Sequence, residues 1–231
     1  MKQPATLNLH DVTIRFRGTG AALVENLELS IAPGTVTTLM GPSGSGKSTL
    51  LSFCAGFLDR SAFAASGAVR IGEERIDGLP AERRHLGLLF QDTLLFPHLS
   101  VGGNLLYGLP RSAARSRRER RLIIESALAQ AGLAGYADRD PDTLSGGQKA
   151  RVALLRTLLA EPRALLLDEP FSKLDAALRA EIRTFIFDHV RAFSLPTLLV
   201  THDAADAEAA GGVIVSTAED GWAPSARVSR I

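Results

Sequence analysis

The residues from Gly41 to Ser48 carry the clearest chemical signal in the sequence. They read Gly-Pro-Ser-Gly-Ser-Gly-Lys-Ser and match the phosphate-binding pattern G-x-x-x-x-G-K-[ST] at every fixed position. An apolar segment, 36–40, precedes them, and apolar residues at helical spacing follow from Ser48 to Phe57. The expected context is therefore strand, loop and helix, and the sequence predicts a site for a nucleoside triphosphate.

The residue types in this loop suit phosphate binding for distinct physical reasons. Glycines allow backbone angles that turn successive N–H groups toward an anion at the positive end of a helix. The lysine adds a mobile cation, the serine after it offers a hard oxygen to Mg²⁺, and the threonine can contact phosphate. The predicted nucleotide-binding residues here are Gly41, Pro42, Ser43, Gly44, Ser45, Gly46, Lys47, Ser48 and Thr49.

Two adjacent carboxylates follow another apolar segment, 163–167. Asp168 can hold Mg²⁺ through water, and Glu169 can polarise a water molecule for in-line attack on a γ-phosphate. An apolar run before acidic residues is common, so this signal becomes strong only together with the phosphate-binding loop.

Composition limits the classes of function. The 231 residues can form one large domain, and the formal charge of +1 gives no global case for a nucleic-acid partner. The single cysteine, Cys54, cannot form a disulfide within the chain, and its helical position favours packing. Neither a signal peptide nor an apolar run of about 18 residues is evident, so any membrane association is expected to be peripheral.

The remaining pattern predicts alternating strands and helices and hence a mostly parallel α/β sheet. Expected strands are 7–16, 23–31, 67–76, 86–90, 163–167 and 195–200, with a hairpin turn at 18–20. Residues from about 95 to 160 are predicted to be mainly helical, and 178–193 to form an amphipathic helix. The tail from Gly211 gives no signal. The basic segment 111–121 is expected to be a solvated face, with attraction to anionic lipid as the alternative.

A second anion-binding helix start is predicted at Leu144-Ser145-Gly146-Gly147-Gln148, where two glycines follow a serine and open a helix. This pentapeptide matches in full the signature motif of the ATP-binding subunits of ABC transporters, and the whole chain resembles that family. The resemblance implies a P-loop NTPase (RecA-like) α/β core with an antiparallel β subdomain and a helical signature subdomain. It implies one domain over 7–231, with the helical subdomain at about 95–160 inserted in the core.

Other matches to the family lie in the family's order along the chain. Gln91 matches the Q-loop glutamine, implied to sense Mg²⁺ and the attacking water, and Ser172-Lys173-Leu174-Asp175 matches the D-loop, in which Asp175 is implied to link two nucleotide sites. His202 matches the switch histidine that contacts the γ-phosphate. Phe16 stands where the family places an aromatic ring against adenine, with a core phenylalanine as the alternative.

The implied cofactors are ATP and Mg²⁺, the latter held by Ser48, Gln91 and Asp168, and the implied catalytic residues are Glu169, His202 and Gln91. Each ATP is expected to lie between the loop of one copy and Ser145, Gly146, Gly147 and Gln148 of a second copy, in a homodimer that closes with ATP and reopens after hydrolysis. A membrane-spanning permease, docked by the segment between Gln91 and Leu144, and an external solute-binding protein are the other implied partners. The expected location is the cytoplasmic face of the inner membrane.

The segment Pro97-His98-Leu99-Ser100-Val101 resembles the importer subfamily that takes up thiamine-like compounds, iron, polyamines or sulfate. The extra C-terminal regulatory domain that many of those subunits carry is not expected here. Gly102 and Gly103 stand where an aromatic and a glutamate are usual, and Lys149-Ala150-Arg151 departs from the common run after the signature. The alternatives are an exporter or lipoprotein-release ATPase, a soluble ABC ATPase acting on nucleic acid or ribosomes, and a small P-loop kinase. The last leaves the signature unexplained.

Overall fold

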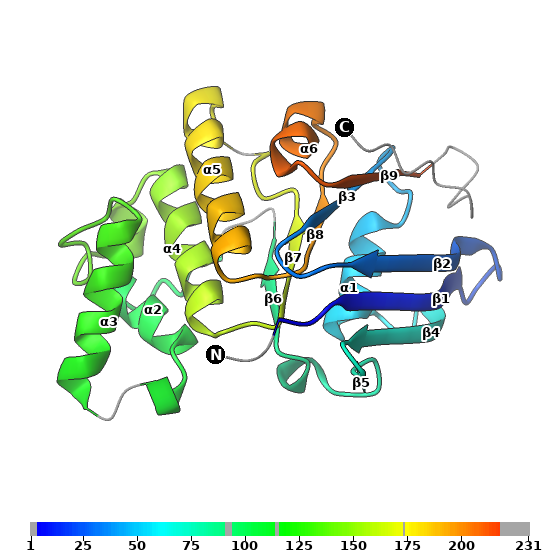
Figure 1. The fold of residues 1–231 in the computed structure, drawn as a ribbon, viewed down its shortest axis with the longest axis horizontal. Helices are drawn as coiled ribbons and strands as arrows, with labels where there is room; N and C mark the ends of the chain where they lie inside the picture. The colour runs from blue at the N-terminus through cyan, green and yellow to red at the C-terminus, as the bar shows by residue number, and fades with distance from the viewer. Residues whose placement is uncertain (1–3, 91–93, 114–115, 173, 218–231) are drawn as a thin grey trace. The chain divides into compact units, whose positions relative to one another are not determined.

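The computed structural model describes residues 4–90, 94–113, 116–172 and 174–217 (Figure 1). Two compact units are formed by these residues. The first, here called the α/β unit, comprises the described residues within Met1–Leu88, Arg163–Glu169 and Phe187–Ile231. The second, called the helical unit, comprises Leu89–Pro162 and Pro170–Ile186.

The α/β unit contains two sheets. A four-stranded sheet has the order β2-β1-β4-β5, and a five-stranded sheet has the order β6-β7-β8-β3-β9. The strands of the first sheet are β1 (Leu7–Phe16), β2 (Ala22–Ile31), β4 (Phe63–Ile71) and β5 (Glu74–Arg75). Those of the second are β3 (Val36–Met40), β6 (Leu86–Leu89), β7 (Ala164–Asp168), β8 (Thr197–Val200) and β9 (Val213–Ser216).

The first sheet pairs antiparallel throughout, and β1, β2 and β4 lie side by side in Figure 1. In the second sheet, β3 pairs parallel with β8 and β9, and β7 pairs parallel with β8. Parallel strands need covered faces, which accounts for the fully buried residues of β8 and the almost continuous apolar run of β7. The phosphate-binding loop therefore leaves the sheet from a strand that has a neighbour on each side.

The tail from Gly211, which gives no signal in the sequence, contains strand β9. Its apolar run is too short to predict a strand from the sequence. In the structure, Val213 to Ser216 pair with Thr37 to Met40 of β3. One correction concerns the helix after the phosphate-binding loop, α1 (Lys47–Ala55), which ends before Phe57; that residue is 63% exposed. Gly56, in a left-handed conformation, ends the helix.

The core of the α/β unit lies between its sheets and α1, with Leu39, Leu50 and Leu166 fully buried. Cys54 is fully buried there too, as the packing role predicts, and burial raises the pKa of its thiol to about 12. Short helical segments Ala81–Arg83 (η1) and α6 (Ala204–Ala210) complete the unit.

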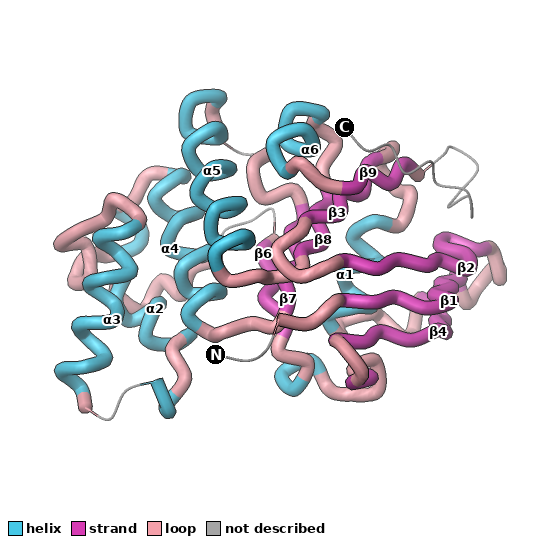
Figure 2. Tube along the Cα trace, in the orientation of Figure 1, coloured by secondary structure: helices cyan, strands magenta, loops and turns pink. Residues whose placement is uncertain are grey.

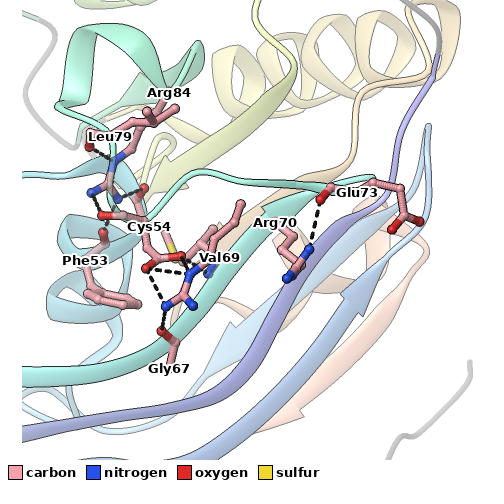
Figure 3. Close-up of polar contacts among 10 residues, drawn as sticks. Phe53, Cys54, Gly67, Val69, Arg70, Glu73, Leu79 and Arg84 are labelled. Carbon is pink, nitrogen blue, oxygen red and sulfur yellow. Dashed lines mark hydrogen bonds and ion pairs between the residues drawn. The ribbon is translucent and has the colours of Figure 1, made fainter.

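A buried arginine closes the C-terminal end of α1, as Figure 3 shows. Arg84 is 4% exposed and donates to the carbonyl oxygens of Phe53 and Cys54 at 2.7 Å each. It also donates to the carbonyls of Leu79 at 2.9 Å and Asp77 at 2.7 Å. One guanidinium thus satisfies orphan carbonyls of the last helical turn and fixes the segment before β6 against them.

The described residues of the helical unit lie in helices and loops, apart from Leu89, the last residue of β6 (Figure 2). Its helices are α2 (Val101–Gly108), α3 (Arg117–Gln130), α4 (Gly146–Leu159) and the first part of α5 (Ala176–Ala192), with the short turns Arg111–Ala113 and Pro141–Thr143. The prediction of a mainly helical segment is confirmed. Helices α2, α3 and α4 pack around a core of Val101, Leu105, Leu128 and Val152, all fully buried.

The first helix of this unit starts normally despite the unusual Gly102 and Gly103. Ser100 is its N-cap and accepts a hydrogen bond from the N–H of Gly103 at 3.1 Å. Gly102 packs where a Cβ would lie 2.9 Å from the carbonyl oxygen of Ala137, so the close approach favours glycine.

The basic segment is partly described. Arg117, Arg118 and Arg121 at the start of α3 are exposed, and Arg121 pairs with Asp138 at 2.9 Å.

Of the residues expected on the apolar face of α5, Ile182, Ile186 and Val190 are buried. Phe193 is not, because it follows the helix and is 55% exposed.

None of the helices in the described part of the chain combines the length and the apolar character that crossing a bilayer requires.

Candidate nucleotide-binding site

The phosphate-binding loop has the backbone that its glycines predict. Gly44 and Gly46 have φ angles of 82° and 91°, which side chains rarely adopt, and Gly46 is the N-cap of α1. A Cβ on Gly46 would also lie 2.7 Å from Cγ of Leu23, so both angle and space require glycine. The loop therefore runs directly into the N-terminus of α1, where backbone N–H groups can bind an anion.

Lys47 lies inside this loop and is 7% exposed. Its ammonium donates to the carbonyl oxygens of Gly41 at 2.9 Å and Pro42 at 2.7 Å, and to Oγ of Ser45 at 3.1 Å. Burial lowers the pKa of Lys47, whereas the carboxylates of Glu169 and Asp168 act to raise it. A phosphate oxygen would replace neutral carbonyls as the partner of this cation.

Two hard oxygen ligands meet between the loop and the end of β7. The Ser48 hydroxyl donates to Oδ1 of Asp168 at 3.1 Å. Burial raises the pKa of Asp168, the bond from Ser48 lowers it, Glu169 raises it and Lys47 lowers it. A partly desolvated carboxylate beside a hydroxyl fits Mg²⁺, which prefers oxygen ligands and usually uses one or two carboxylates with substrate phosphates.

Glu169 directly follows β7 and has a φ of 46°, in the left-handed region that non-glycine residues rarely occupy. Its N–H donates to the carbonyl of Val200 at 2.9 Å, which fixes its backbone to the end of β8. Oε1 of Glu169 lies 3.0 Å from Nδ1 of His202. The carboxylate and imidazole that the sequence places 33 residues apart are thus in hydrogen-bond contact.

The residues flanking His202 are anchored, which explains its position. Thr201 is buried, donates its N–H to the carbonyl oxygen of Leu39 at 3.3 Å, and donates its hydroxyl to Oδ2 of Asp206 at 3.0 Å. Asp203 caps α6 by accepting from the N–H of Ala205 at 2.8 Å. The side chain of His202 between them is 65% exposed.

Phe16 is not a core residue, because its side chain remains 40% exposed at the end of β1. Its ring contacts that of Phe63 with centroids 5.2 Å apart and planes tilted by 42°. Arg17 donates to the carbonyl of Phe63 at 3.2 Å. A partly exposed aromatic ring at the end of a strand suits stacking on a base, and this role for Phe16 stays a prediction.

The signature residues open α4 in the helical unit. Ser145 and Gln148 form a reciprocal capping box, with bonds of 3.3 Å to the N–H of Gln148 and 3.0 Å to the N–H of Ser145. Ser145 and Gly146 are exposed, whereas Gly147 is buried where a Cβ would lie 2.1 Å from Cδ2 of Leu178. The exposed helix start is therefore held by α5.

Asp175 caps α5, since its Oδ1 accepts from the N–H of Leu178 at 3.1 Å. Its predicted role in linking two nucleotide sites stays a prediction. Gln91 and Lys173 lie outside the described residues. Of the other loop residues, Pro42, Ser43 and Gly44 are exposed, and Thr49 is half-buried in α1.

Sequence reasoning missed three residues that position these segments. Thr217, after β9, contacts the phosphate-binding loop. In the helical unit, the side chain of Asn104, 0% exposed, bonds the backbone of Phe96 through both its oxygen and its nitrogen, and Arg156 donates to the carbonyl of Leu94 at 2.7 Å. A polar residue inside the otherwise apolar face of α2 was the only signal for Asn104.

Comparison with known proteins agrees with this geometry. The family model described as "ABC transporter" matches residues 24–172. The ABC transporter ATP-binding protein YnjD of Escherichia coli (strain K12) is 50% identical over 192 residues, covering 83% of this chain and 87% of that protein. The Fe(3+) ions import ATP-binding protein FbpC of Brucella abortus (strain 2308) is 41% identical over 221 residues, 96% of this chain and 61% of that protein.

A second iron-import relative, FbpC 2 of Rhodococcus jostii (strain RHA1), is 44% identical over 190 residues and is covered over 53% of its length. This chain thus spans little more than half of the iron-import relatives. The chain belongs to the ABC transporter family. It is an ATP-binding and ATP-hydrolysing subunit of that class, and the predictions of family, fold class and enzyme activity are confirmed. The nucleic-acid or ribosome alternative finds no support in these relatives.

Proposed function

We propose that this subunit energises the import of a small solute through a separate membrane-spanning permease, at the cytoplasmic face of the membrane, with an external solute-binding protein delivering the cargo. Several relatives are named for Fe(3+) import, so ferric iron is the first cargo to test. The observation that carries the catalytic part is the contact of Glu169 with His202 beside the paired Ser48 and Asp168.

In the proposed reaction, the loop amides and Lys47 bind the phosphates, and Ser48 and Asp168 would hold Mg²⁺. The metal would neutralise charge on the phosphate oxygens. Glu169 accepts a proton from the attacking water, whose oxygen bonds to the γ-phosphorus while the bond to the β-phosphate oxygen breaks. His202 orients the Glu169 carboxylate and contacts the γ-phosphate. Gln91, outside the described residues, is proposed to sense the same water.

ATP also joins two copies in this proposal. The loop of one copy and Ser145, Gly146, Gly147 and Gln148 of the other bind the same nucleotide, with Asp175 linking the two sites and Phe16 stacking on adenine. Two features support it: both helix starts suit phosphate, and the signature helix start is exposed. Hydrolysis removes the bridge between the copies, so closure and reopening can be coupled to the permease.

The test is phosphate release from ATP with Mg²⁺ by the purified chain and by Glu169→Gln, with oligomeric state followed by light scattering. The native chain is expected to turn over, and the variant to lose roughly 100-fold or more of its rate and accumulate as an ATP-bound dimer. The matched control is Glu82→Gln, an exposed glutamate of the same unit. Equal rates for Glu169→Gln and the native chain would remove Glu169 from the mechanism.

A further inference from the structure

Thr217 joins the edge strand β9 to the start of the phosphate-binding loop. Its N–H donates to the carbonyl oxygen of Met40 at 2.7 Å, which extends the pairing of β9 with β3 by one residue. The side chain is 4% exposed. Residue 217 therefore lies at the base of the loop, 172 positions after Ser45 in the chain, where the sequence alone gives no hint of contact.

The Thr217 hydroxyl reaches the middle of the loop. It donates to Oγ of Ser45 at 3.0 Å, and the same Ser45 oxygen accepts from the ammonium of Lys47 at 3.1 Å. A chain of hydrogen bonds thus runs from β9 through Ser45 to the lysine.

Gly41 makes room for this contact. A Cβ on Gly41 would lie 1.8 Å from Oγ1 of Thr217, so any larger residue would displace the hydroxyl. The first glycine of the motif therefore has a second role here besides its backbone angle. It lets a side chain from another strand enter the loop.

Ser45 also makes a backbone contact inside the loop. Within the loop, the Ser45 N–H reaches the carbonyl of Pro42 at 3.4 Å, close to the limit of a hydrogen bond. The hydroxyl contact from Thr217 is shorter and comes from a strand that is paired with β3.

We propose that Thr217 is a positioning residue for ATP binding, which holds Ser45, and through it Lys47, in the arrangement that accepts the phosphates. This inference rests on the proposed function of the same loop. Thr217 acts on the binding step, because it contacts Met40 and Ser45 and lies against Gly41 in the phosphate-binding loop.

The experiment measures ATP affinity by titration calorimetry in EDTA, where hydrolysis is blocked, and kcat separately with Mg²⁺. Thr217→Val keeps the side-chain shape and removes the hydroxyl. It is expected to weaken ATP binding about three- to tenfold, the effect of one lost hydrogen bond, with kcat within about twofold of the native value. Thr217→Ser, which restores the hydroxyl, is expected to bind as the native chain does.

The matched control is Thr197→Val. Thr197 is a buried threonine of the same sheet, and its hydroxyl donates to the carbonyl of Leu195 at 3.2 Å, away from the loop. Its loss costs stability but is expected to leave ATP affinity unchanged. A double-mutant cycle adds Ser45→Ala, and Thr217→Val is expected to have no further effect in that background, because the shared bond is already gone.

Native affinity in Thr217→Val, failure of Thr217→Ser to restore binding, an equal loss in Thr197→Val, or additive losses in the cycle would each overturn the inference. A native chain that binds no ATP would instead overturn the proposed function of the loop, so the two failures are distinguishable.

Discussion

At the scale of single residues, the burial of Arg84 leads to a prediction about stability. Replacement by leucine leaves the carbonyls of Phe53, Cys54, Asp77 and Leu79 without this donor in a buried place. Arg84→Leu is therefore expected to lower the free energy of unfolding by about 3 kcal/mol or more. Denaturant unfolding followed by circular dichroism measures the change.

The neighbouring Arg83 provides the control, because it is exposed. Arg83→Leu is expected to change the free energy of unfolding by no more than about 0.5 kcal/mol. Comparable losses for both arginines would mean that the hydrogen bonds of Arg84 add nothing to stability.

The carboxyl group of Asp168 leads to a prediction about how stability and turnover depend on pH and on this side chain. Its pKa is raised in the folded chain, chiefly by burial, so its ionised form is less favourable there than in the unfolded chain. The free energy of unfolding is therefore not reduced by Asp168 at low pH, where the carboxyl is neutral in both states. It falls as the pH rises through the raised pKa and Asp168 ionises in the folded chain. Asp168→Asn is expected to raise the free energy of unfolding at pH 7 and to lose Mg²⁺-dependent turnover.

The gain should shrink as the pH falls toward the ordinary value of 3.8, since native Asp168 is then neutral too. Denaturant unfolding at pH 7 and pH 4 measures the free energy of unfolding of the native chain and of Asp168→Asn. A gain that is the same at both values, or a loss at pH 7, would contradict the assigned origin of the pKa shift.

Some residues of the site could be predicted from sequence because their types and spacing are local. The glycines of the loop, Lys47 and Ser48 lie within eight consecutive positions, and their geometry follows from strand, loop and helix. Arg84 and Thr217 could not be predicted, because their roles arise from contacts with Cys54 and Ser45, which are distant in the chain.

At the scale of elements, the contact of α4 with α5 leads to the next prediction. Gly147 lies against Leu178, and an added Cβ would meet Cδ2 at 2.1 Å. Gly147→Ala is therefore expected to lower the free energy of unfolding by about 1 to 3 kcal/mol through overpacking. Thermal or denaturant unfolding measures it.

Removing the opposing side chain tests the cause. Leu178→Ala in the Gly147→Ala background is expected to cost less than the sum of the two single changes, because it vacates the space that the new methyl group needs. Additive losses would show that the methyl group is accommodated elsewhere and that Leu178 does not press on the signature helix.

The segment before α2 depends on one side chain. The Asn104 amide donates to the carbonyls of Phe96, Leu99 and Ser100, and its oxygen accepts from the N–H of Phe96. Asn104→Ala is expected to lower stability by about 1 to 3 kcal/mol and to speed hydrogen exchange of the Phe96 amide. Unchanged exchange there would exclude Asn104 as the anchor of this segment.

Helices and strands were predicted correctly where the hydrophobic pattern extends over many residues. The ten residues of β1 and the fourteen of α4 lie where the apolar spacing predicts them. Strand β9 was missed because four residues carry too little periodicity, and its pairing with β3 is a tertiary contact. Phe193 was predicted as the last residue of the apolar helical face, but α5 ends one residue earlier, at Ala192.

At the scale of the whole molecule, the exposed start of the signature helix bears on the proposed ATP-bridged dimer. Dimer formation makes thermal stability depend on protein concentration, since the associated state is favoured by mass action. Glu169→Gln with ATP is therefore expected to melt at a higher temperature when its concentration is raised about tenfold. Without nucleotide, the melting temperature should not respond. Scanning fluorimetry at two concentrations measures both.

Gly146 allows the interface itself to be tested. A Cβ on Gly146 meets no atom within 4 Å, so Gly146→Leu fits the single chain, yet a bulky side chain there would block a nucleotide bound by a second copy. In the Glu169→Gln background it is expected to preserve ATP binding and to abolish the concentration dependence of melting. Gly78→Leu, at an exposed glycine with equally open space, should leave that dependence intact. If Gly146→Leu also leaves it intact, the signature helix start does not lie at the ATP-bridged interface.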